Sequence, residues 1–316
     1  MISRRYLRIK TFQALYAYFH SGKENQKKVE NELFLSFQKM HDLYLLFLLI
    51  GSELSHLSML KIEESKSKRL PTDADLNPST KFITNRIFKL LETNSTLSNF
   101  VKEKKISWNI DQELMTKLFN FTRKHDIYLN YMQNEDNSFE NDKKFVVALY
   151  KKIIAEYDFL ISGISEKSIY WTYDEIDFVL SMVIKSIKKL KENDSNLDAI
   201  FHNFTDKEDD TEFVKILFNK TIVDDKENSK LIAEKTQNWE VERIATVDIL
   251  IMKMAISELT SFSQIPIKVT LNEYIDLSKT YSTPKSKLFV NGILDKLIVD
   301  LKSNGKIVKT GRGLVE

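Results

Sequence analysis

Apolar side chains recur every three or four residues along much of the chain, the spacing that places them on one face of a helix. The clearest case near the start is the series Ile9, Phe12, Tyr16 and Phe19. This series predicts a helix whose apolar face docks on another part of the protein. The most apolar run, residues 43–50, is far shorter than the roughly 20 residues needed to cross a bilayer. It therefore predicts a buried helix, with no membrane partner.

Four stretches rich in turn-forming or acidic residues interrupt these helical patterns. They are Ser21-Gly22 and residues 71–78, 134–142 and 205–210. The 316 residues include only 7 Gly and 4 Pro, and 42% are hydrophobic, so the chain can bury at least one large core. Long helices joined by polar loops fit this composition, and the predicted fold class is all-α.

The three tryptophans indicate an internal repeat. The intervals Phe82 to Trp108, Phe145 to Trp171 and Phe213 to Trp239 are each 26 residues long. A period of about 60 to 70 residues predicts a repeated unit of about three helices. The alternative is that bulky aromatic residues recur on buried helix faces by chance. The last two units also align without a gap at Leu149/Leu217, Tyr150/Phe218, Ile154/Ile222, Ile164/Ile232, Val179/Val247 and Val183/Ile251.

Several kinds of chemistry are excluded by composition. The chain has no cysteine, which removes disulfides, thiolate metal sites and cysteine nucleophiles and fits a reducing compartment. Its five histidines are scattered and none forms an HExxH pattern, so no metal or other cofactor is expected. There is no Gly-rich nucleotide loop, and we assign no catalytic residue. The basic start lacks a sustained apolar segment, so we predict no export signal and a cytoplasmic location.

The last hundred residues carry the most specific motifs. They are residues 239–248 (WEVERIATVD), 265–273 (IPIKVTLNE) and 289–295 (FVNGILD). Their order and spacing resemble the NusB family of transcription antitermination factors. The amino-terminal residues 4–8 (RRYLR) and 13–16 (QALY) resemble that family's Arg-rich first helix. The resemblance implies a non-enzymatic, all-helical protein that acts in the antitermination complex of RNA polymerase and binds single-stranded RNA and the small-subunit ribosomal protein NusE.

The likeness covers residues 1–20 and 205–300, and the middle of the chain is additional. We therefore expect a long form of the family in which two degenerate copies of the repeated unit are inserted. In this interpretation, residues 1–60 are amino-terminal helices that pack on the carboxy-terminal bundle. Residues 61–204 are the inserted repeat region, residues 205–300 the NusB-like bundle, and residues 301–316 a basic flexible tail.

Positive charge gathers at the two ends of the chain, although the formal net charge is only +2. Arg4, Arg5, Arg8 and Lys10 precede any acid, and residues 279–316 contain eight Lys or Arg against three Asp or Glu. Cations at the start of a helix oppose its dipole, so an external partner is expected to stabilise them, and RNA phosphates fit this role. The alternative is a solvated basic start with no partner.

The resemblance implies that the first helix and the FVNG segment lie side by side in one RNA site. Lys285 and Lys287 are predicted to contact phosphates. Phe289 is a candidate for stacking on a base, and Asn291 and Gln13 are candidates for hydrogen bonds to base edges. Phe289 is equally compatible with a core position. The neighbouring Gly292 is compatible with close packing between helices.

Most of the remaining motif residues are expected to stabilise the fold, and one is expected to contact a protein partner. Thr270 and Glu273 have the spacing of a capping box, which favours a helix start at Thr270. Trp239 and Arg243 are expected to be mostly structural. The resemblance implies that Asp248 is an accessible acid that meets the basic NusE protein, where it would affect association rate and specificity.

The predicted function is therefore antitermination of ribosomal RNA transcription through leader RNA and NusE. Two other functions remain open at this stage. The chain is also compatible with a non-enzymatic helical-repeat scaffold that binds only proteins. It is further compatible with the RNA-binding part of an RNA-modifying enzyme, since some RNA methyltransferases carry a NusB-like domain.

Overall fold

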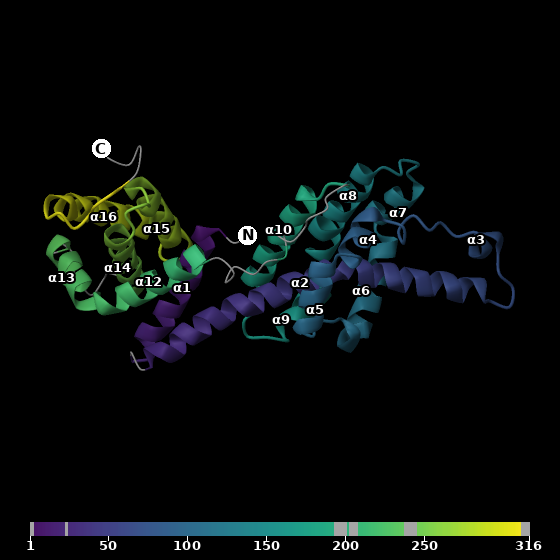
Figure 1. Ribbon diagram of the computed structural model, residues 1–316, viewed down its shortest axis with the longest axis horizontal. Coiled ribbons are helices and arrows are strands. Elements are labelled where there is room, and N and C mark those ends of the chain that lie inside the picture. The colour runs from purple at the N-terminus through teal and green to yellow at the C-terminus, as the bar shows by residue number, and fades with distance from the viewer. Residues whose placement is uncertain (1–2, 23–24, 193–200, 202–207, 237–244, 311–316) are drawn as a thin grey trace. The chain divides into compact units, whose positions relative to one another are not determined.

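The computed structural model describes residues 3–22, 25–192, 201, 208–236 and 245–310. These residues form helices joined by loops, and none of them forms a strand, so the predicted all-α fold is confirmed (Figure 1). The chain divides into two compact units. The middle unit consists of Ser36–Asn203, and the terminal unit consists of Ile2–Leu35 together with Phe204–Glu316.

The middle unit contains most of α2 (Gln26–Lys66) and the shorter helices that surround it. Residues 43–51 of α2 are buried except for the half-buried Leu49, as the apolar run predicts. The shorter elements are α3 (Asp73–Leu76), α4 (Arg86–Glu92), α5 (Ser95–Glu103), the 3₁₀ helix η1 (Asn109–Asp111), α6 (Gln112–Lys124), α7 (Asp126–Gln133), α8 (Phe139–Ala148), the π-helix η2 (Leu149–Ile154), α9 (Asp158–Ser165) and α10 (Tyr173–Lys189).

Close packing holds the shorter helices on α2. A Cβ atom placed on Gly51 would lie 2.4 Å from ring atoms of Phe88, so α4 reaches the backbone of α2 only because residue 51 has no side chain. The hydroxyl of Tyr150 donates a 2.6 Å hydrogen bond to the carbonyl of Phe47. Burial raises the pKa of Tyr150 above its usual value, so this phenol stays protonated.

Among the described residues, α2 is the one helix with an 18-residue window apolar enough to span a membrane. Within that window, 56% of the residues are buried by other parts of the protein. A buried core helix passes the same test of length and composition as a membrane span. The packing of this window therefore favours the predicted role of α2 as a core helix.

Two of the three tryptophans make the same contact with α2. The indole Nε1 of Trp108 donates to the carbonyl of Leu46, and that of Trp171 donates to the carbonyl of Lys39, each at 2.9 Å. The two carbonyls are seven residues apart on α2, or about two helical turns. Trp239 lies outside the described residues. The first two repeat units are therefore similar in this respect, while the threefold repeat stays a prediction.

Three of the four predicted breaks coincide with helix ends, with small shifts; of the fourth, residues 205–207 lie outside the described residues and residues 208–210 are the first of α12. The first helix ends at His20, and Gly22 follows with a φ of 78°, a conformation that favours glycine. Residues 71–78 separate α2 from α4 but contain the short α3, whose capping box joins Thr72 and Asp75. The break at 134–142 ends at Ser138, which caps α8, so its last four residues are helical.

The terminal unit is arranged around α14, which packs against each of the other carboxy-terminal helices and against α1. Its buried residues occur on all sides of the helix, from Leu250 to Leu259. The helices of this unit are α1 (Arg4–His20), the first turns of α2, α12 (Glu208–Val223), α13 (Asp225–Lys235), α14 (Thr246–Ser261), α15 (Ile267–Tyr281) and α16 (Ser286–Ser303).

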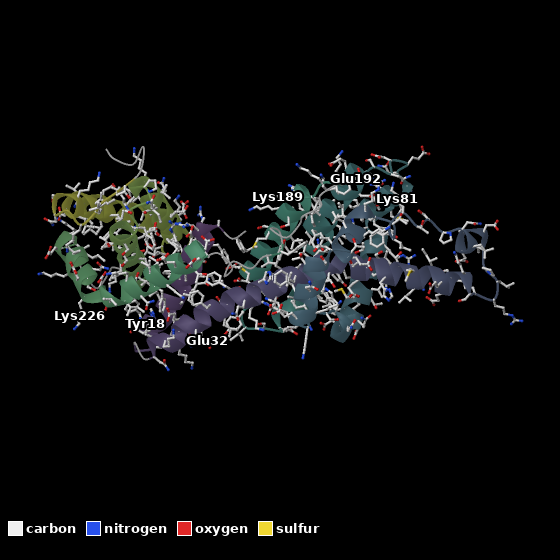
Figure 2. The ribbon with its side chains drawn as sticks, in the orientation of Figure 1. Tyr18, Glu32, Lys81, Lys189, Glu192 and Lys226 are labelled. Carbon is white, nitrogen blue, oxygen red and sulfur yellow. The ribbon has the colours of Figure 1, made fainter. Side chains whose placement is uncertain are left out.

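The first helix docks on α12 and α14, but its apolar face differs from the predicted one. Leu7, Leu15 and Tyr18, the last labelled in Figure 2, are buried. Phe12 is also buried, whereas Tyr16 remains 39% exposed, so the prediction was wrong for Tyr16. The spacing of three and four residues fits several overlapping stripes on one helix, and the positions of α12 and α14 select the stripe that includes Leu7 and Leu15.

The segment predicted as a flexible tail begins inside the folded structure. Helix α16 continues to Ser303, so residues 301–303 are helical. Further along, the ammonium group of Lys309 donates to the carbonyls of Leu259 (3.0 Å) and Phe262 (2.8 Å) at the end of α14. Burial lowers the pKa of Lys309, which is consistent with this inward position. The predicted tail is therefore corrected for residues 301–310, and residues 311–316 lie outside the described residues.

Candidate nucleic-acid interface

Arg4 and Arg5 stand at the start of α1 with accessible guanidinium groups. Ser3 caps this helix by accepting a hydrogen bond from the backbone N–H of Tyr6. Arg4 lies 3.6 Å from Asp210, and Arg5 lies 3.1 Å from Asp276. Both arginine side chains remain at least 43% exposed. Exposed ion pairs contribute little to stability, so both cations can turn to a phosphate without a large loss.

Arg8 is not part of the accessible surface, and the prediction that it contacts RNA is wrong. Its side chain is only 2% exposed. Its Nε and Nη2 atoms each lie 2.7 Å from an oxygen of Glu258 on α14, which makes a bidentate ion pair. Burial alone would lower the pKa of Arg8, but the hydrogen bond and charge of Glu258 outweigh it and raise the pKa. The charge of Arg8 therefore neutralises Glu258 inside the protein and is not available to bind a phosphate.

The same buried carboxylate joins α15 to this pair. The hydroxyls of Thr270 and Tyr274 donate to Glu258 at 2.8 and 3.0 Å. Helix α15 begins at Ile267 after Pro266, so Thr270 lies inside the first turns and the predicted capping box is wrong. The IPIKVTLNE motif instead supplies hydroxyl groups that solvate a buried carboxylate, which satisfies its hydrogen-bonding capacity.

Lys10 is also buried, although the sequence predicted that it contacts phosphate. It is 8% exposed, and its Nζ atom lies 5.8 Å from the centre of the Tyr6 ring. An ammonium group over an aromatic face is stabilised by the ring itself. This position removes Lys10 from the surface that a phosphate could reach, and we correct its assignment.

Lys285 and Lys287 are exposed at the start of α16, as predicted for phosphate contacts. Beneath them, the hydroxyl of Ser286 lies 2.8 Å from that of Thr283 and 2.9 Å from that of Ser282. Ser286 also donates a 2.6 Å hydrogen bond to Asp248 of α14. These hydrogen bonds of the buried Ser286 fix the first turn of α16 and so fix where the two lysines emerge.

Asp248 is buried, and the prediction that it is accessible to a protein partner is wrong. The residue is 3% exposed. One carboxylate oxygen accepts the hydrogen bond from Ser286, and the other is buried without a hydrogen-bond partner. Asp248 therefore joins α14 to α16 inside the terminal unit. Trp239 and Arg243, the other two members of that motif, lie outside the described residues.

We predict that Asp248→Ala lowers the free energy of unfolding by about 1–3 kcal/mol, because it removes the buried hydrogen bond from Ser286 that joins α16 to α14. Urea denaturation would measure the loss. Asp295→Ala, which removes an exposed acid of α16, serves as the control and should change stability by less than about 0.5 kcal/mol. Equal stabilities for the two variants would show that Asp248 has no structural role.

The candidate base-reading residues lie on two helices. Gln13 is exposed on α1, whereas Phe289 and Asn291 are partly exposed on α16. The amide of Asn291 donates to Asp295 at 3.1 Å. Gly292 is exposed, and a Cβ atom placed on it would meet nothing within 4 Å, so the close packing considered for it is absent. Glycine at this position destabilises the helix by about 1 kcal/mol relative to alanine, and no packing contact offsets that loss.

Helix α15 connects α1 to the beginning of α16. Arg5 pairs with Asp276 of α15, and the ring of Phe12 lies 5.1 Å from that of Tyr281, the last residue of α15. Four residues then lead to Ser286, the first residue of α16. The first helix and the FVNG helix are thus joined through the end of α15, while α1 itself packs on α12 and α14.

Neighbouring aromatic rings continue along α1 to an exposed position that the sequence did not predict. They lead from Phe12 to Tyr16 and from Tyr16 to His20, with ring centres 6.2 and 3.9 Å apart. Tyr16 and His20 are both exposed, and their rings are stacked. Since Tyr16 was counted among the core residues, its exposed ring could not be recognised from spacing alone. The ring lies on the same helix as Gln13, within one turn of it.

Comparison with known proteins identifies the family. The NusB family profile matches residues 181–299. A transcription antitermination protein NusB from Salinibacter ruber is 36% identical over 138 residues, which cover 42% of this chain and 86% of that protein. The chain belongs to the NusB family. A NusB protein from Chloroherpeton thalassium is 41% identical over 105 residues, covering 33% of this chain and 50% of that protein.

A third NusB protein, from Alkaliphilus oremlandii, is 33% identical over 109 residues, or 34% of this chain and 79% of that protein. No solved structure matches the chain. Membership of the NusB family supports a role in transcription antitermination. This chain is a long form, because its 316 residues extend well beyond the 138 residues that match the relative from Salinibacter ruber.

Within the described residues, no group of three or more histidine or acidic side chains could hold a metal ion. His41 is an example of a histidine with a structural role. It is buried in the middle unit, where Nε2 lies 2.7 Å from the carbonyl of Phe201 and Nδ1 lies 2.9 Å from the ammonium of Lys104. These contacts make His41 a structural residue of the core.

Proposed function

We propose that this NusB protein binds single-stranded leader RNA of ribosomal operons together with the small-subunit ribosomal protein NusE, and so supports ribosomal RNA transcription in the antitermination complex of RNA polymerase. The observation that carries the proposal is the placement of four exposed cations in the terminal unit. Arg4 and Arg5 begin α1, and Lys285 and Lys287 begin α16. In this proposal the protein acts in the cytoplasm and catalyses no reaction.

The chemistry of these groups fits an RNA backbone. Guanidinium groups bind phosphate oxygens in pairs, and exposed ammonium groups add charge without a fixed geometry. Each phosphate contact releases counterions, so the affinity should fall as salt rises. Phe289, Asn291 and Gln13 are the proposed base contacts, since unpaired bases are recognised by stacking and by hydrogen bonds to their edges.

We further propose that the chain is divided by role. The terminal unit corresponds to the NusB-like bundle with α1 and the first turns of α2, and the middle unit corresponds to the inserted repeat region together with residues 36–60, which the sequence had assigned to the amino-terminal helices. The similar contacts of Trp108 and Trp171 on α2 support the interpretation of the middle unit as two degenerate copies of one unit. RNA binding is assigned to the terminal unit alone.

The test of this function is a titration of the full chain with single-stranded leader RNA from a ribosomal operon of the same organism. It is run with and without that organism's NusE protein. We expect salt-dependent RNA binding that becomes tighter when NusE is present, because the two proteins would share one RNA. A chain that binds NusE but no RNA at low salt would instead be a protein-binding scaffold.

Removing one phosphate contact should change the salt dependence of RNA affinity by a defined amount. Lys285→Ala and Lys287→Ala are each expected to weaken RNA binding for all sequences and to flatten the slope of log K against log salt by about one unit. Asn291→Ala should change sequence preference with the slope retained. Lys226, an exposed cation of α13 that is labelled in Figure 2, provides the control, and Lys226→Ala should leave both properties unchanged.

Equal slopes for the variants of Lys285, Lys287 and Lys226 would show that the start of α16 does not contact phosphates. The affinity would then have to come from other parts of the protein. Denaturation curves for the same variants confirm that each remains folded, since exposed lysines contribute little to stability.

A further inference from the structure

Three aromatic side chains form one strip on the surface of the middle unit, where α6 packs against α9. The rings of Phe121 and Tyr157 are stacked with their centres 4.5 Å apart, and the ring of Phe159 lies 6.2 Å from that of Tyr157. Phe121 is 38% exposed, Phe159 is 48% exposed, and Tyr157 is half-buried. Single exposed apolar residues are common, but a contiguous exposed aromatic group is not, so this α6–α9 strip indicates a binding surface.

A pocket of about 350 Å³ adjoins the strip, and Phe159 forms part of its wall. Its lining includes three acids and one lysine, namely Asp111, Glu113, Glu166 and Lys167. Two of these acids are paired, since Asp111 contacts Lys167 and Glu113 lies 2.7 Å from Lys117. Glu166 is exposed and makes no ion pair with any of the described residues. The pocket therefore places an available carboxylate and an aromatic ring around one space.

The ring of Phe159 already contacts a cation of the protein itself. The ammonium group of Lys117 lies 4.3 Å from the centre of that ring. Lys117 does not line the pocket, so this contact leaves the pocket open to a second cation. An aromatic ring stabilises an ammonium or guanidinium group, and a carboxylate adds charge-assisted hydrogen bonds. Together, Phe159 and Glu166 fit the side chain of a lysine or an arginine from outside the chain.

The charge of the segments around the strip favours a basic protein partner over RNA. Residues 111–126 and 156–167 together contain six Asp or Glu and four Lys or Arg. RNA phosphates bind where positive charge is concentrated, and here negative charge is in excess. Exposed aromatic side chains, by contrast, are the usual anchors of protein interfaces.

We propose that the α6–α9 strip and its pocket form a docking surface for a basic segment of a partner protein. A lysine or arginine of that segment enters the pocket beside Glu166 and Phe159. An apolar side chain of the same segment packs on the stacked rings of Phe121 and Tyr157. This inference is independent of the proposed RNA binding, which uses the terminal unit.

The experiment uses the full chain to select peptides from a display library of random dodecapeptides. The library is first depleted on a variant that combines Phe159→Ser with Glu166→Lys, so the peptides that the wild type then retains require this surface. We expect the retained peptides to be enriched in Lys or Arg together with a nearby apolar residue. Retention of no peptide, or of peptides without a cation, would overturn the proposal.

A charge reversal tests the role of Glu166 with one retained peptide, whose affinity is measured by fluorescence anisotropy. Phe159→Ser and Glu166→Lys should each weaken its binding by about tenfold, as expected for central interface residues. A peptide with Glu in place of its cation should bind Glu166→Lys more tightly than it binds the wild type. Leu70→Ser and Glu63→Lys, at two exposed positions elsewhere in the middle unit, are the matched controls and should leave the affinity unchanged.

The variants also separate this proposal from the RNA site. Glu166 follows the last residue of α9, where a lysine favours the helix dipole, so Glu166→Lys should remain folded. Leader-RNA affinity should be the same in the wild type and in both variants. Equal peptide affinities in the wild type, Phe159→Ser and Glu166→Lys would overturn the docking surface. Weaker RNA binding by Phe159→Ser would instead identify the strip as a nucleic-acid surface. A wild-type chain that binds the peptide but no RNA would reject the proposed function alone.

Discussion

Arg8→Ala is expected to destabilise the terminal unit by about 3–5 kcal/mol, the loss typical of removing one partner from a buried ion pair. The substitution would leave Glu258, which is fully buried, with its charge uncompensated. The hydroxyls of Thr270 and Tyr274 would still donate to that carboxylate, but hydroxyl groups cannot neutralise it. Urea denaturation followed by circular dichroism would measure the loss.

The matched control for Arg8→Ala removes both charges at once. Arg8→Met combined with Glu258→Gln keeps the approximate volumes and leaves an amide oxygen to accept from the two hydroxyls. This double variant should be more stable than Arg8→Ala, since an apolar or neutral replacement of a whole buried pair is often well tolerated. If Arg8→Ala were as stable as the wild type, the bidentate contact with Glu258 would not exist in solution, and Arg8 would again be available to RNA.

Trp108→Ala is expected to cost the middle unit about 3–5 kcal/mol, because this fully buried indole fills the space beside α2. Trp108→Phe retains most of that volume and removes the hydrogen bond to the carbonyl of Leu46, so its cost should include about 1 kcal/mol for the lost hydrogen bond. Thermal or urea unfolding of the full chain would measure both variants.

The repeat predicts a matching response at Trp171. Trp171→Phe removes the equivalent hydrogen bond to Lys39 and should cost a similar amount, although Trp171 is less buried than Trp108. Trp171→Ala should therefore cost less than Trp108→Ala. A loss in Trp108→Phe with no loss at all in Trp171→Phe would mean that the two tryptophans are not equivalent and that the first two repeat units differ in construction.

Fold class and the ends of helices were predictable because they depend on local signals. Few glycines and prolines, together with apolar spacing of three and four residues, predicted an all-helical protein. The turn at Ser21-Gly22 was visible because glycine supplies the left-handed conformation found there. The buried apolar run in α2 was likewise a property of consecutive residues.

The site residues were predicted less well because their environment depends on distant parts of the chain. Arg8 and Glu258 are 250 residues apart, so no local pattern reveals that the charge of Arg8 is neutralised inside the protein. The hydroxyl that binds Asp248 lies 38 residues further along, at Ser286. A basic segment of a helix therefore contains both surface and core cations, and only the packing of α1 separates Arg4 and Arg5 from Arg8 and Lys10.

The family motifs were recognised as motifs, but several of their members have structural roles. Asp248 positions α16, and Thr270 solvates Glu258. Gly292 differs from these residues because a Cβ atom placed on it would meet nothing within 4 Å, so close packing does not explain the glycine.

The most direct measurement of the central claim is transcription through a terminator placed downstream of a ribosomal-operon leader, in a purified system with RNA polymerase and the NusE protein. Adding the full chain should raise the fraction of transcripts that pass the terminator. A double variant, Lys285→Ala with Lys287→Ala, should raise that fraction less, in proportion to its weaker RNA binding. The same read-through with and without the chain, at concentrations where it binds leader RNA, would contradict the account.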